Sequence, residues 1–316
     1  MKYLVTGGAG FIGSNIVEEL IRRGDDVRVI DNFSTGKREN LKQFEKDITL
    51  IEGDIRSYHT VIDAVKGVDV VIHQAALPSV PRSIADPISS NDVIVNGTLN
   101  LLYASKQENV NRLVFASSSS IYGDTPKLPK HESMIPNPLS PYAVSKLAAE
   151  KYFSVFARIY GLETFSLRYF NVFGPRQDPN SHYSAVIPKF IAALLKDKQP
   201  VIYGDGEQTR DFTYIDNVVA GNLLASTVVG CESGLVMNCA CHERISLNSL
   251  VDTLNKILGK NIRPKYVDPR KGDIKHSYAS IELIAEKLNY RPSVKFEEGI
   301  RKTVEYYREY FSTFTL

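Results

Sequence analysis

The residues best suited to take part in a chemical reaction are a tyrosine and a lysine in the segment SPYAVSK at 140–146. Ser140 and Pro141 are typical of the N-cap and first position of a helix, so Tyr142 and Lys146 are expected one turn apart on the same face. A free tyrosine has a pKa of about 10, so work as a base near pH 7 requires the phenolate to be stabilised by roughly 4 kcal/mol. The Lys146 ammonium and the positive end of the helix dipole would both contribute. The pair is a candidate for taking a proton from a hydroxyl group.

A serine-rich segment, ASSSSIYG at 116–123, supplies a third candidate. It follows a predicted strand, and ligands of doubly wound sheets bind at the carboxyl ends of the strands. Ser118 is therefore placed to hydrogen-bond the reacting hydroxyl. Taken separately, a Tyr and a Lys at this spacing can be a surface pair, and a serine-rich segment can be an ordinary loop. Together the three residues predict the oxidation or reduction of an alcohol.

The segment GGAGFIG at 7–13 follows a predicted strand and opens a predicted helix, which is the context of a dinucleotide-binding loop. Gly7 permits the tight turn, Gly10 lets a pyrophosphate approach the backbone, and Gly13 lets the helix pack closely on the sheet. A purely structural turn is the alternative. The acidic residue that follows decides between the two.

Asp31 ends the second predicted strand, 18 residues past Gly13, where a carboxylate accepts both hydroxyls of an adenosine ribose. The same carboxylate repels a 2′-phosphate, and Asn32 adds no cation, so the predicted cofactor is NAD rather than NADP. Asp54 is placed to meet the adenine, although a surface turn would also explain it. The positive nicotinamide ring would further stabilise a phenolate at Tyr142.

The elements that must position these residues alternate in type. Short β-branched runs separate amphipathic stretches, which is typical of buried parallel strands joined by helices. The predicted strands span 3–5, 27–30, 48–51, 68–72, 113–115 and 164–167, and the predicted helices span 12–23, 60–65, 93–109 and 141–159. We therefore predict an α/β fold with a Rossmann-type doubly wound parallel sheet.

Past about residue 174 the alternation gives way to Pro- and Asn-rich connections and separate helical patterns. A helix at 216–229 and a strand at 235–239 are expected to return to the first sheet. The predicted organisation is an NAD-binding Rossmann domain at 1–174, joined by about 213–240, and a smaller C-terminal α/β substrate lobe at 175–212 and 241–316.

The composition excludes several classes of partner. The 316 residues carry a formal net charge of +2 with both signs interspersed, which predicts no binding to nucleic acid or to a membrane surface. Cys231, Cys239 and Cys241 lack the number for a secreted disulfide framework and the spacing of a zinc site, so reduced, mostly buried thiols and no metal are expected. A strand at 2–5 in place of a targeting segment, and the lack of a membrane-spanning apolar run, predict a cytoplasmic protein.

The glycine loop, the Ser118, Tyr142 and Lys146 set and four further segments together resemble the extended short-chain dehydrogenase/reductase family, and within it the UDP-sugar 4-epimerases. The segments are HQAA at 73–76, RYFNVFGP at 168–175, GDGEQTRDF at 204–212 and RKGDI at 270–274. The resemblance implies tightly held NAD that is reduced and reoxidised within one cycle. A hydride would leave carbon 4 of the sugar, the 4-keto sugar would swing about its diphosphate link, and the hydride would return to the opposite face.

The resemblance also assigns roles. Tyr142 would be the base at the sugar 4-hydroxyl, Lys146 its activator and Ser118 its hydrogen-bonding partner. Implied cofactor contacts are Gly7, Gly10, Phe11, Ile12, Gly13, Asp31, Asn32, Ser34, Thr35, Gly36, Asp54, Ile55, Gln74, Ala75, Ala76, Asn96, Tyr142, Lys146 and Tyr169. Implied substrate contacts are Ser79, Arg82, Ser118, Ser119, Asn171, Ala185, Val186, Tyr203, Arg210, Arg270, Asp273 and Ser277, of which Asn171, Arg210, Arg270 and Asp273 would hold the UDP part.

Three segments resemble the bacterial epimerases of UDP-N-acetylglucosamine and UDP-N-acetylgalactosamine: ALPSVPRSI at 76–84, RQDPN at 176–180 and KHSYA at 275–279. The resemblance places Ser277 beside the sugar 2-substituent, where epimerases restricted to UDP-glucose and UDP-galactose have a bulky tyrosine. A small serine leaves space for an acetamido group. We expect action on the N-acetylated pair, and also on UDP-glucose and UDP-galactose.

Other functions remain as alternatives. A nucleotide-sugar 4,6-dehydratase typically carries Asp-Glu where this chain has Ser119 and Ser120, and a UDP-glucuronate decarboxylase also has an acid in that loop. Without such a carboxylate, elimination of water has no obvious acid or base. A non-catalytic NAD-binding sensor is the third alternative, although such proteins commonly lose the Tyr or the Lys.

The resemblance implies a homodimer through a four-helix interface formed by the helices at 93–109 and 141–159. Their apolar faces include Leu99, Leu102, Leu147 and Phe153, which would equally fit an ordinary core.

Overall fold

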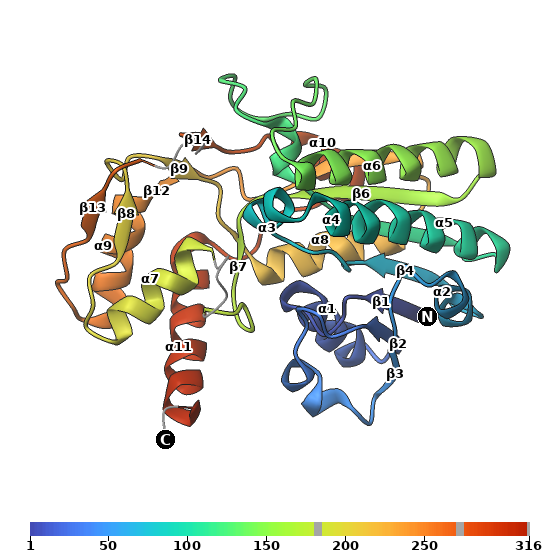
Figure 1. The fold of residues 1–316 in the computed structure, drawn as a ribbon, viewed down its shortest axis with the longest axis horizontal. Coiled ribbons are helices and arrows are strands. Elements are labelled where there is room, and N and C mark those ends of the chain that lie inside the picture. The colour runs from blue at the N-terminus through green and yellow to red at the C-terminus, as the bar shows by residue number, and fades with distance from the viewer. Residues whose placement is uncertain (180–184, 270–274, 315–316) are drawn as a thin grey trace.

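The computed structural model describes residues 1–179, 185–269 and 275–314. Its centre is a seven-stranded parallel sheet, whose strands are β1 (Lys2–Thr6), β2 (Asp26–Asp31), β3 (Ile48–Glu52), β4 (Val70–His73), β5 (Arg112–Ser118), β6 (Glu163–Tyr169) and β11 (Leu235–Cys239). The strand order is β11-β6-β5-β4-β1-β2-β3, which reverses direction between β1 and β4 (Figure 1). This is the doubly wound α/β sheet that the alternating pattern predicted, and β11 is the strand expected at 235–239. Ligands bind at such a reversal, outside the carboxyl ends of the strands.

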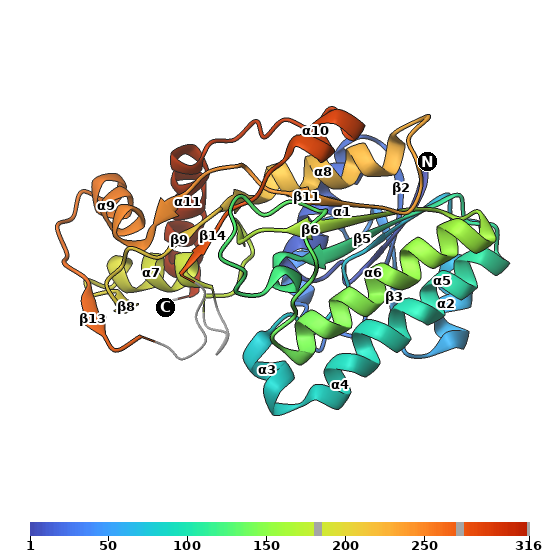
Figure 2. The same ribbon diagram turned by 90° about the horizontal axis from the view of Figure 1, so that it is seen from above.

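Helices cover both faces of the sheet (Figure 2), and its inner strands are buried between them, whereas the edge strand β3 is largely exposed. The helices α1 (Phe11–Arg22) and α8 (Ile215–Thr227) pack on one face, and α2 (Tyr58–Val65), α5 (Gly97–Gln107) and α6 (Pro141–Tyr160) pack on the other. The helix predicted at 93–109 is divided, since a π-helical turn (Asp92–Asn96) precedes α5. Two short helices that the sequence did not predict, α3 (Val80–Ala85) and α4 (Pro87–Asn91), lie against α6.

The start of α6 follows the predicted capping pattern. The Ser140 hydroxyl accepts a hydrogen bond of 3.2 Å from the amide of Ala143, and Pro141 occupies the first turn. Within α5 and α6, Leu102 and Phe153 are fully buried in the protomer's own core, so neither is available to a partner. Burial against the sheet explains their apolar character.

The apolar side chains that α5 and α6 expose are different ones. They are Tyr103, Val144, Val155, Ile159 and Tyr160.

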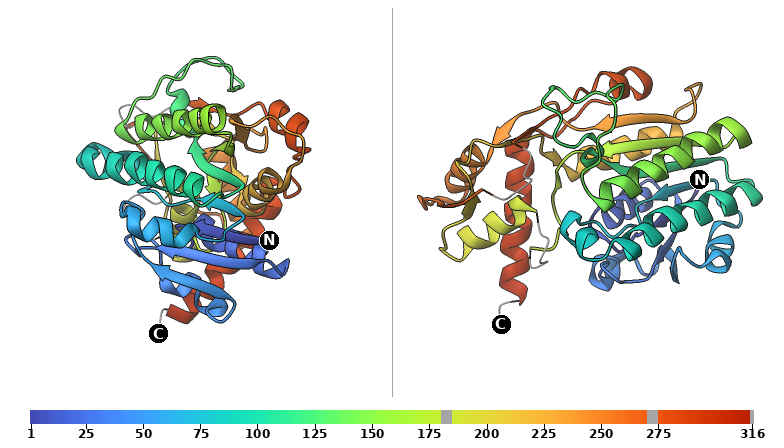
Figure 3. Two further views of the ribbon diagram at one scale, coloured as in Figure 1. Left: turned by 90° about the vertical axis from the view of Figure 1, so that its right-hand side faces the viewer. Right: turned by 45° about the horizontal axis from the view of Figure 1, so that its top comes forward.

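The second lobe is built from helices and short strands on one side of the sheet's carboxyl edge (Figure 3). Its helices are α7 (Val186–Leu195), α9 (Leu247–Leu258) and α11 (Phe296–Phe314), whereas α10 (Glu282–Leu288) packs against β11 and α8 beside the sheet. Its strands pair as β8 (Val201–Tyr203) with β13 (Lys265–Val267), as β9 (Thr209–Arg210) between β12 (Ile245–Ser246) and β14 (His276–Ser277), and as β7 (Val172–Phe173) with β10 (Thr213–Tyr214).

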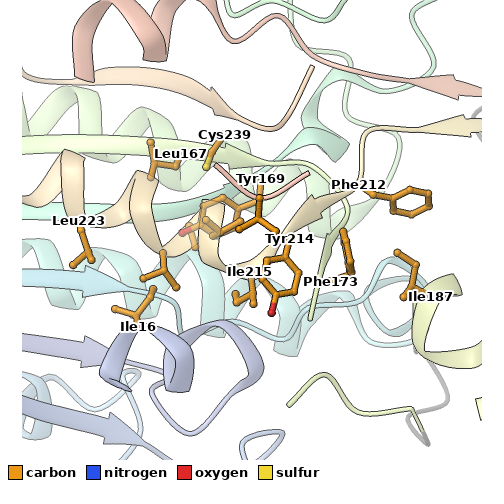
Figure 4. Packing of buried hydrophobic residues seen from close by; sticks show 14 of the residues in the cluster. Ile16, Leu167, Tyr169, Phe173, Ile187, Phe212, Tyr214, Ile215, Leu223 and Cys239 are labelled. Carbon is orange, nitrogen blue, oxygen red and sulfur yellow. The ribbon is translucent and has the colours of Figure 1, made fainter. Parts of the chain in front are cut away.

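One hydrophobic core joins the lobe to the sheet. Figure 4 shows this core extending from the face of the sheet to the lobe, through Ile16, Leu167, Tyr169, Tyr214, Phe173, Phe212 and Ile187. The rings of Phe173 and Tyr214 meet edge to face with centroids 5.6 Å apart. Cys239 is buried in this core, whereas Cys231 and Cys241 are half-buried. Among the described residues, no helix combines the length and apolar character needed to cross a membrane.

Candidate active site

Two adjoining cavities lie at the carboxyl edge of the sheet. The first, of about 760 Å³, extends from the glycine loop after β1 to Tyr142 and Lys146 on α6. The second, of about 500 Å³, lies among the strands and helices of the second lobe. Val172 and Ala185 line both, so a ligand seated in the second cavity can extend into the first.

The glycine loop is packed too tightly for side chains. A Cβ built on Gly13 would come within 2.2 Å of the Gly7 carbonyl oxygen, and one built on Gly7 would lie 2.7 Å from the Ala75 amide nitrogen. Gly7 also has a φ of +67°, in the left-handed region. The start of α1 therefore approaches the sheet as closely as the sequence predicted, and its backbone borders the first cavity.

Asp31 lies at the end of β2 on the wall of the first cavity. Its two carboxylate oxygens accept hydrogen bonds from the amides of Ala9 (2.9 Å) and Phe33 (2.8 Å). Burial raises the pKa of this carboxyl group, and the two backbone hydrogen bonds oppose that rise. Each oxygen keeps a lone pair for a further donor, as ribose hydroxyls would require.

Asp54 stands at the adenine end of the predicted cofactor site. It accepts hydrogen bonds from Asn32 (2.8 Å) and from the Arg56 guanidinium (2.8 and 3.0 Å). The Arg56 guanidinium and these hydrogen bonds lower the pKa of Asp54 to about 2, against a smaller effect of burial. Arg56 neutralises this end of the site, a contribution that the sequence did not reveal.

Most of the predicted cofactor residues line the first cavity, and two do not. Gly36 packs against Asp31, since a Cβ there would lie 2.9 Å from both carboxylate oxygens. Asn96 is exposed and donates to Asp92. The residues that do line the cavity are Gly7, Gly10, Phe11, Ile12, Gly13, Asp31, Asn32, Ser34, Thr35, Asp54, Ile55, Gln74, Ala75, Ala76, Tyr142, Lys146 and Tyr169.

Sequence reasoning missed that Arg176 and Asp178 form a strap, a short segment that contributes to the wall of this cavity. Asp178 forms a 2.9 Å ion pair with Lys37, another lining residue. Arg176 donates to the Ser14 carbonyl of α1 and pairs with Glu18. The RQDPN segment was notable only for its resemblance, because nothing in its local pattern shows where it folds.

The catalytic candidates meet at the end of β5. The Lys146 ammonium donates a 2.6 Å hydrogen bond to the Ala116 carbonyl and lies 5.8 Å from the centre of the Tyr142 ring. Ser118 lies close enough to the Tyr142 phenol to lower its pKa. These three residues are thus brought together as predicted.

The protein groups do not by themselves lower the pKa of Tyr142. Burial raises it to about 12, and the hydrogen bond from Ser118 opposes this only in part. Burial also lowers the pKa of Lys146 to about 7, while the Glu150 carboxylate acts in the opposite direction. Burial therefore favours the neutral phenol in the protein without NAD, and the stabilisation of the phenolate by Lys146 and the helix dipole stays a prediction.

The serine loop differs in detail from the expectation. The Ser118 hydroxyl accepts hydrogen bonds from the Ser120 amide (3.2 Å) and hydroxyl (2.9 Å). Ala116 and Ser117 line the first cavity, whereas Ser118 and Ser119 are not part of the wall of either cavity. Ser117 instead directs its hydroxyl to Glu150.

The predicted substrate residues divide between the cavities. Ser79, Arg82 and Ala185 line the first, and Asn171, Ala185, Val186, Tyr203 and Arg210 line the second. Ser277 is half-buried and pairs with Arg210 between β14 and β9, outside both linings. Arg270 and Asp273 lie outside the described residues.

Arg210 is held in place by the backbone. It donates to the carbonyls of Thr209 (3.0 Å) and Lys275 (3.2 Å). A guanidinium in the wall of this cavity is a candidate for binding a phosphate group.

The first cavity fits NAD on its own geometry. Its glycine backbone leaves no room for Cβ atoms, a buried carboxylate closes one end, and a Tyr–Lys pair closes the other. Asp31 would hold the adenosine ribose, the glycine loop the pyrophosphate, and Lys146 the nicotinamide ribose.

Comparison with known proteins agrees with this geometry. Residues 3–240 match the NAD dependent epimerase/dehydratase family. The chain is 36% identical over 312 residues to a UDP-glucose 4-epimerase of Mycolicibacterium smegmatis, covering 98% of this chain and 99% of that protein. A solved UDP-N-acetylglucosamine 4-epimerase from Methanobrevibacter ruminantium M1, in complex with UDP-N-acetylmuramic acid, is 43% identical with a TM-score of 0.93 over 98% of both chains.

A UDP-glucose 4-epimerase from Thermotoga maritima, solved with UDP-glucose, is 38% identical with a TM-score of 0.93, over 98% of this chain and 100% of that chain. By its family match and by these identities over nearly its whole length, the chain belongs to the NAD dependent epimerase/dehydratase family, where it groups with the UDP-sugar 4-epimerases.

Proposed function

We propose that the protein epimerises a UDP-hexose at carbon 4, with NAD as its cofactor. The observation that carries the proposal is that the two cavities adjoin: Tyr142 and Lys146 line the first, Arg210 lines the second, and both share Val172 and Ala185. A nucleotide diphosphate in the second cavity would direct its sugar toward Tyr142.

The chain's own residues manage the proton and the orientation. Tyr142 takes the proton from the 4-hydroxyl and later returns it, and Ser118 hydrogen-bonds the same oxygen. Lys146 holds the end of β5 through the Ala116 carbonyl and supplies positive charge beside the phenol. When bound, NAD accepts a hydride from carbon 4 and gives it back, and its positive ring favours the phenolate that burial disfavours.

For the sugar, we propose UDP-N-acetylglucosamine and UDP-N-acetylgalactosamine, with UDP-glucose and UDP-galactose also accepted. The support is the small side chain of Ser277, which is paired in the β9–β14 register with Arg210, a lining residue of the second cavity. The solved relatives are named for UDP-N-acetylglucosamine in one case and UDP-glucose in the other, in keeping with both pairs.

The two lobes would bind different ligands: residues 1–174 and 213–240 would hold NAD, and residues 175–212 and 241–316 would hold the nucleotide sugar.

We also propose a homodimer through α5 and α6. Its support is the set of exposed apolar side chains on these helices, among them Tyr103, Val155 and Ile159. Light scattering gives the molar mass in solution and tests the dimer directly.

A dehydratase or a decarboxylase is the second candidate, because the family includes dehydratases. Ser119 and Ser120 stand where those enzymes would need a carboxylate, which favours epimerisation. One assay separates the candidates: incubation with both UDP-hexose pairs and UDP-glucuronate, followed by chromatography, mass spectrometry and nuclear magnetic resonance. Unchanged mass with inversion at carbon 4 supports the proposal, and loss of water or carbon dioxide supports the second candidate. Binding of NAD without turnover would indicate a sensor.

A further inference from the structure

Residues on three successive turns of α6 each face one of the last three residues of β5. Tyr142 lies beside Ser118, Lys146 donates to the Ala116 carbonyl at 2.6 Å, and Glu150 accepts the Ser117 hydroxyl at 2.5 Å. The first two contacts belong to the proposed catalytic set, whereas Glu150 has no role in it. Tyr142, Lys146 and Glu150 thus form a row on α6 that faces β5, and the row extends beyond the residues that line the cavity.

We propose that Glu150 is a positioning residue, which holds the end of β5 against α6 and keeps the Lys146 ammonium charged. The inference rests on the proposed function, since it concerns the same reaction. Glu150 lies one turn beyond Lys146 and its side chain is 1% exposed, so solvent does not screen its charge.

The Glu150 carboxylate is itself fixed from β6. Arg168 binds it through Nε at 2.9 Å and Nη2 at 2.8 Å, and the guanidinium stacks over the Tyr122 ring at 4.7 Å. A bidentate pair of this kind sets the direction of both partners. The Glu150 carboxylate is therefore oriented by Arg168 so that its Oε1 also accepts the hydrogen bond from the Ser117 hydroxyl on β5.

The charged and titratable groups around this row are few. His73 on β4 is buried and stays neutral, since burial lowers its pKa to about 3 with a smaller contribution from Lys146. Tyr142 on α6 is protonated at neutral pH because burial raises its pKa. Arg168, with Glu132 beyond it, faces Glu150. Glu150 is consequently the anion that offsets the burial of the Lys146 ammonium.

The test uses holoenzyme carrying Glu150→Gln together with Arg168→Met, which removes both charges and so leaves no buried guanidinium unpaired. We expect the kcat for the UDP-sugar to fall about tenfold or more with little change in KM. The acidic limb of the kcat profile should move to higher pH, and the alkaline limb to lower pH, by about one pH unit each.

A matched control is Glu163→Gln, which removes the carboxylate of an Arg–Glu pair at the opposite end of β6, where Arg112 Nε binds it at 2.8 Å. Its pH profile should stay as in the wild type. Ser117→Ala removes only the hydrogen bond to Glu150, so kcat should fall without a shift of either limb. This variant remains informative if the double variant does not fold.

A second readout does not depend on turnover. Nuclear magnetic resonance of lysine labelled at Cε, with Lys146→Met to identify the signal, follows the Lys146 titration directly. The double variant should titrate at lower pH than the wild type. An unchanged Lys146 titration together with unshifted limbs would overturn the inference, and absence of any epimerase activity in the wild type would instead refute the proposed function.

Discussion

The Lys146 ammonium lies 2.6 Å from the Ala116 carbonyl oxygen, so the central residue of the proposed catalytic set binds the strand that carries Ser118. The helix and the strand therefore keep a fixed register beside the cavity.

Tyr142→Phe should lower kcat about 100- to 10,000-fold, because the ring still packs while the group that exchanges the proton is lost. Bound NAD should remain at the wild-type level, measured by absorbance after denaturation. Tyr103→Phe, on the exposed face of α5, serves as control and should keep full activity. Equal activity of the two variants would remove Tyr142 from the mechanism.

Lys146 should make stability depend on pH in the nucleotide-free protein. The pKa of Lys146 is about 7 in the folded protein, whereas an ordinary lysine, as in the unfolded chain, has a pKa of 10.5. As the pH rises, the folded protein therefore loses this proton before the unfolded chain does. Between these values the unfolded chain binds more protons, and raising the pH should increase the free energy of unfolding.

Measured by chemical denaturation, the wild type should gain up to about 3 kcal/mol relative to Lys146→Met between pH 7 and about 9.5. The Tyr142 phenol has the opposite effect, but only above pH 10, because its pKa is raised from 10 to about 12. If the difference in the free energy of unfolding between the wild type and Lys146→Met shrinks as the pH rises from 7, Lys146 is not desolvated.

Asp31→Asn should weaken NAD binding about 10- to 100-fold, since hydrogen bonds to a charged acceptor are replaced by weaker ones. Discrimination against NADP should decrease, because the repulsion of the 2′-phosphate is gone. Calorimetric titration with both nucleotides checks this. Asp63→Asn, which breaks an exposed 2.6 Å pair with Lys66, should leave both affinities unchanged.

Gly13→Ala should destabilise the protein by about 1–3 kcal/mol or prevent folding, because its Cβ would meet the Gly7 carbonyl oxygen at 2.2 Å. Gly24→Ala is the matched control: its φ of +80° is unfavourable, but nothing lies within 4 Å of the added atom. The control should lose only about 1 kcal/mol. An equal shift of the denaturation midpoint in the two variants would argue against the close approach of α1 to the sheet.

Ser277→Tyr should selectively reduce turnover of the N-acetylated pair, because the larger side chain would occupy the space beside the sugar 2-substituent. Activity on UDP-glucose and UDP-galactose should be retained. Parallel kcat/KM measurements with the four substrates test it. Equal loss on both pairs would refute a steric role for Ser277.

The sequence was sufficient for features that depend on local pattern. The glycine spacing, the capping of α6 by Ser140 and the alternation of strands and helices are each encoded within a few residues, so the sheet, the NAD loop and the Tyr142–Lys146 pair could be predicted. The division of 93–109 by a π-helical turn could not, since apolar periodicity does not distinguish the two helix types at this length.

The tertiary structure alone decided the properties that depend on distant neighbours. The strap with Arg176 and Asp178, the burial of Leu102 and Phe153 in the protomer's own core, and the pairing of Glu150 with Ser117 and Arg168 join segments far apart in the chain. The sequence predicted Tyr142 as the candidate for proton transfer, but the pKa of its phenol is set by how completely the fold removes it from water. Desolvation is a property of all the surrounding atoms, and no local pattern encodes it.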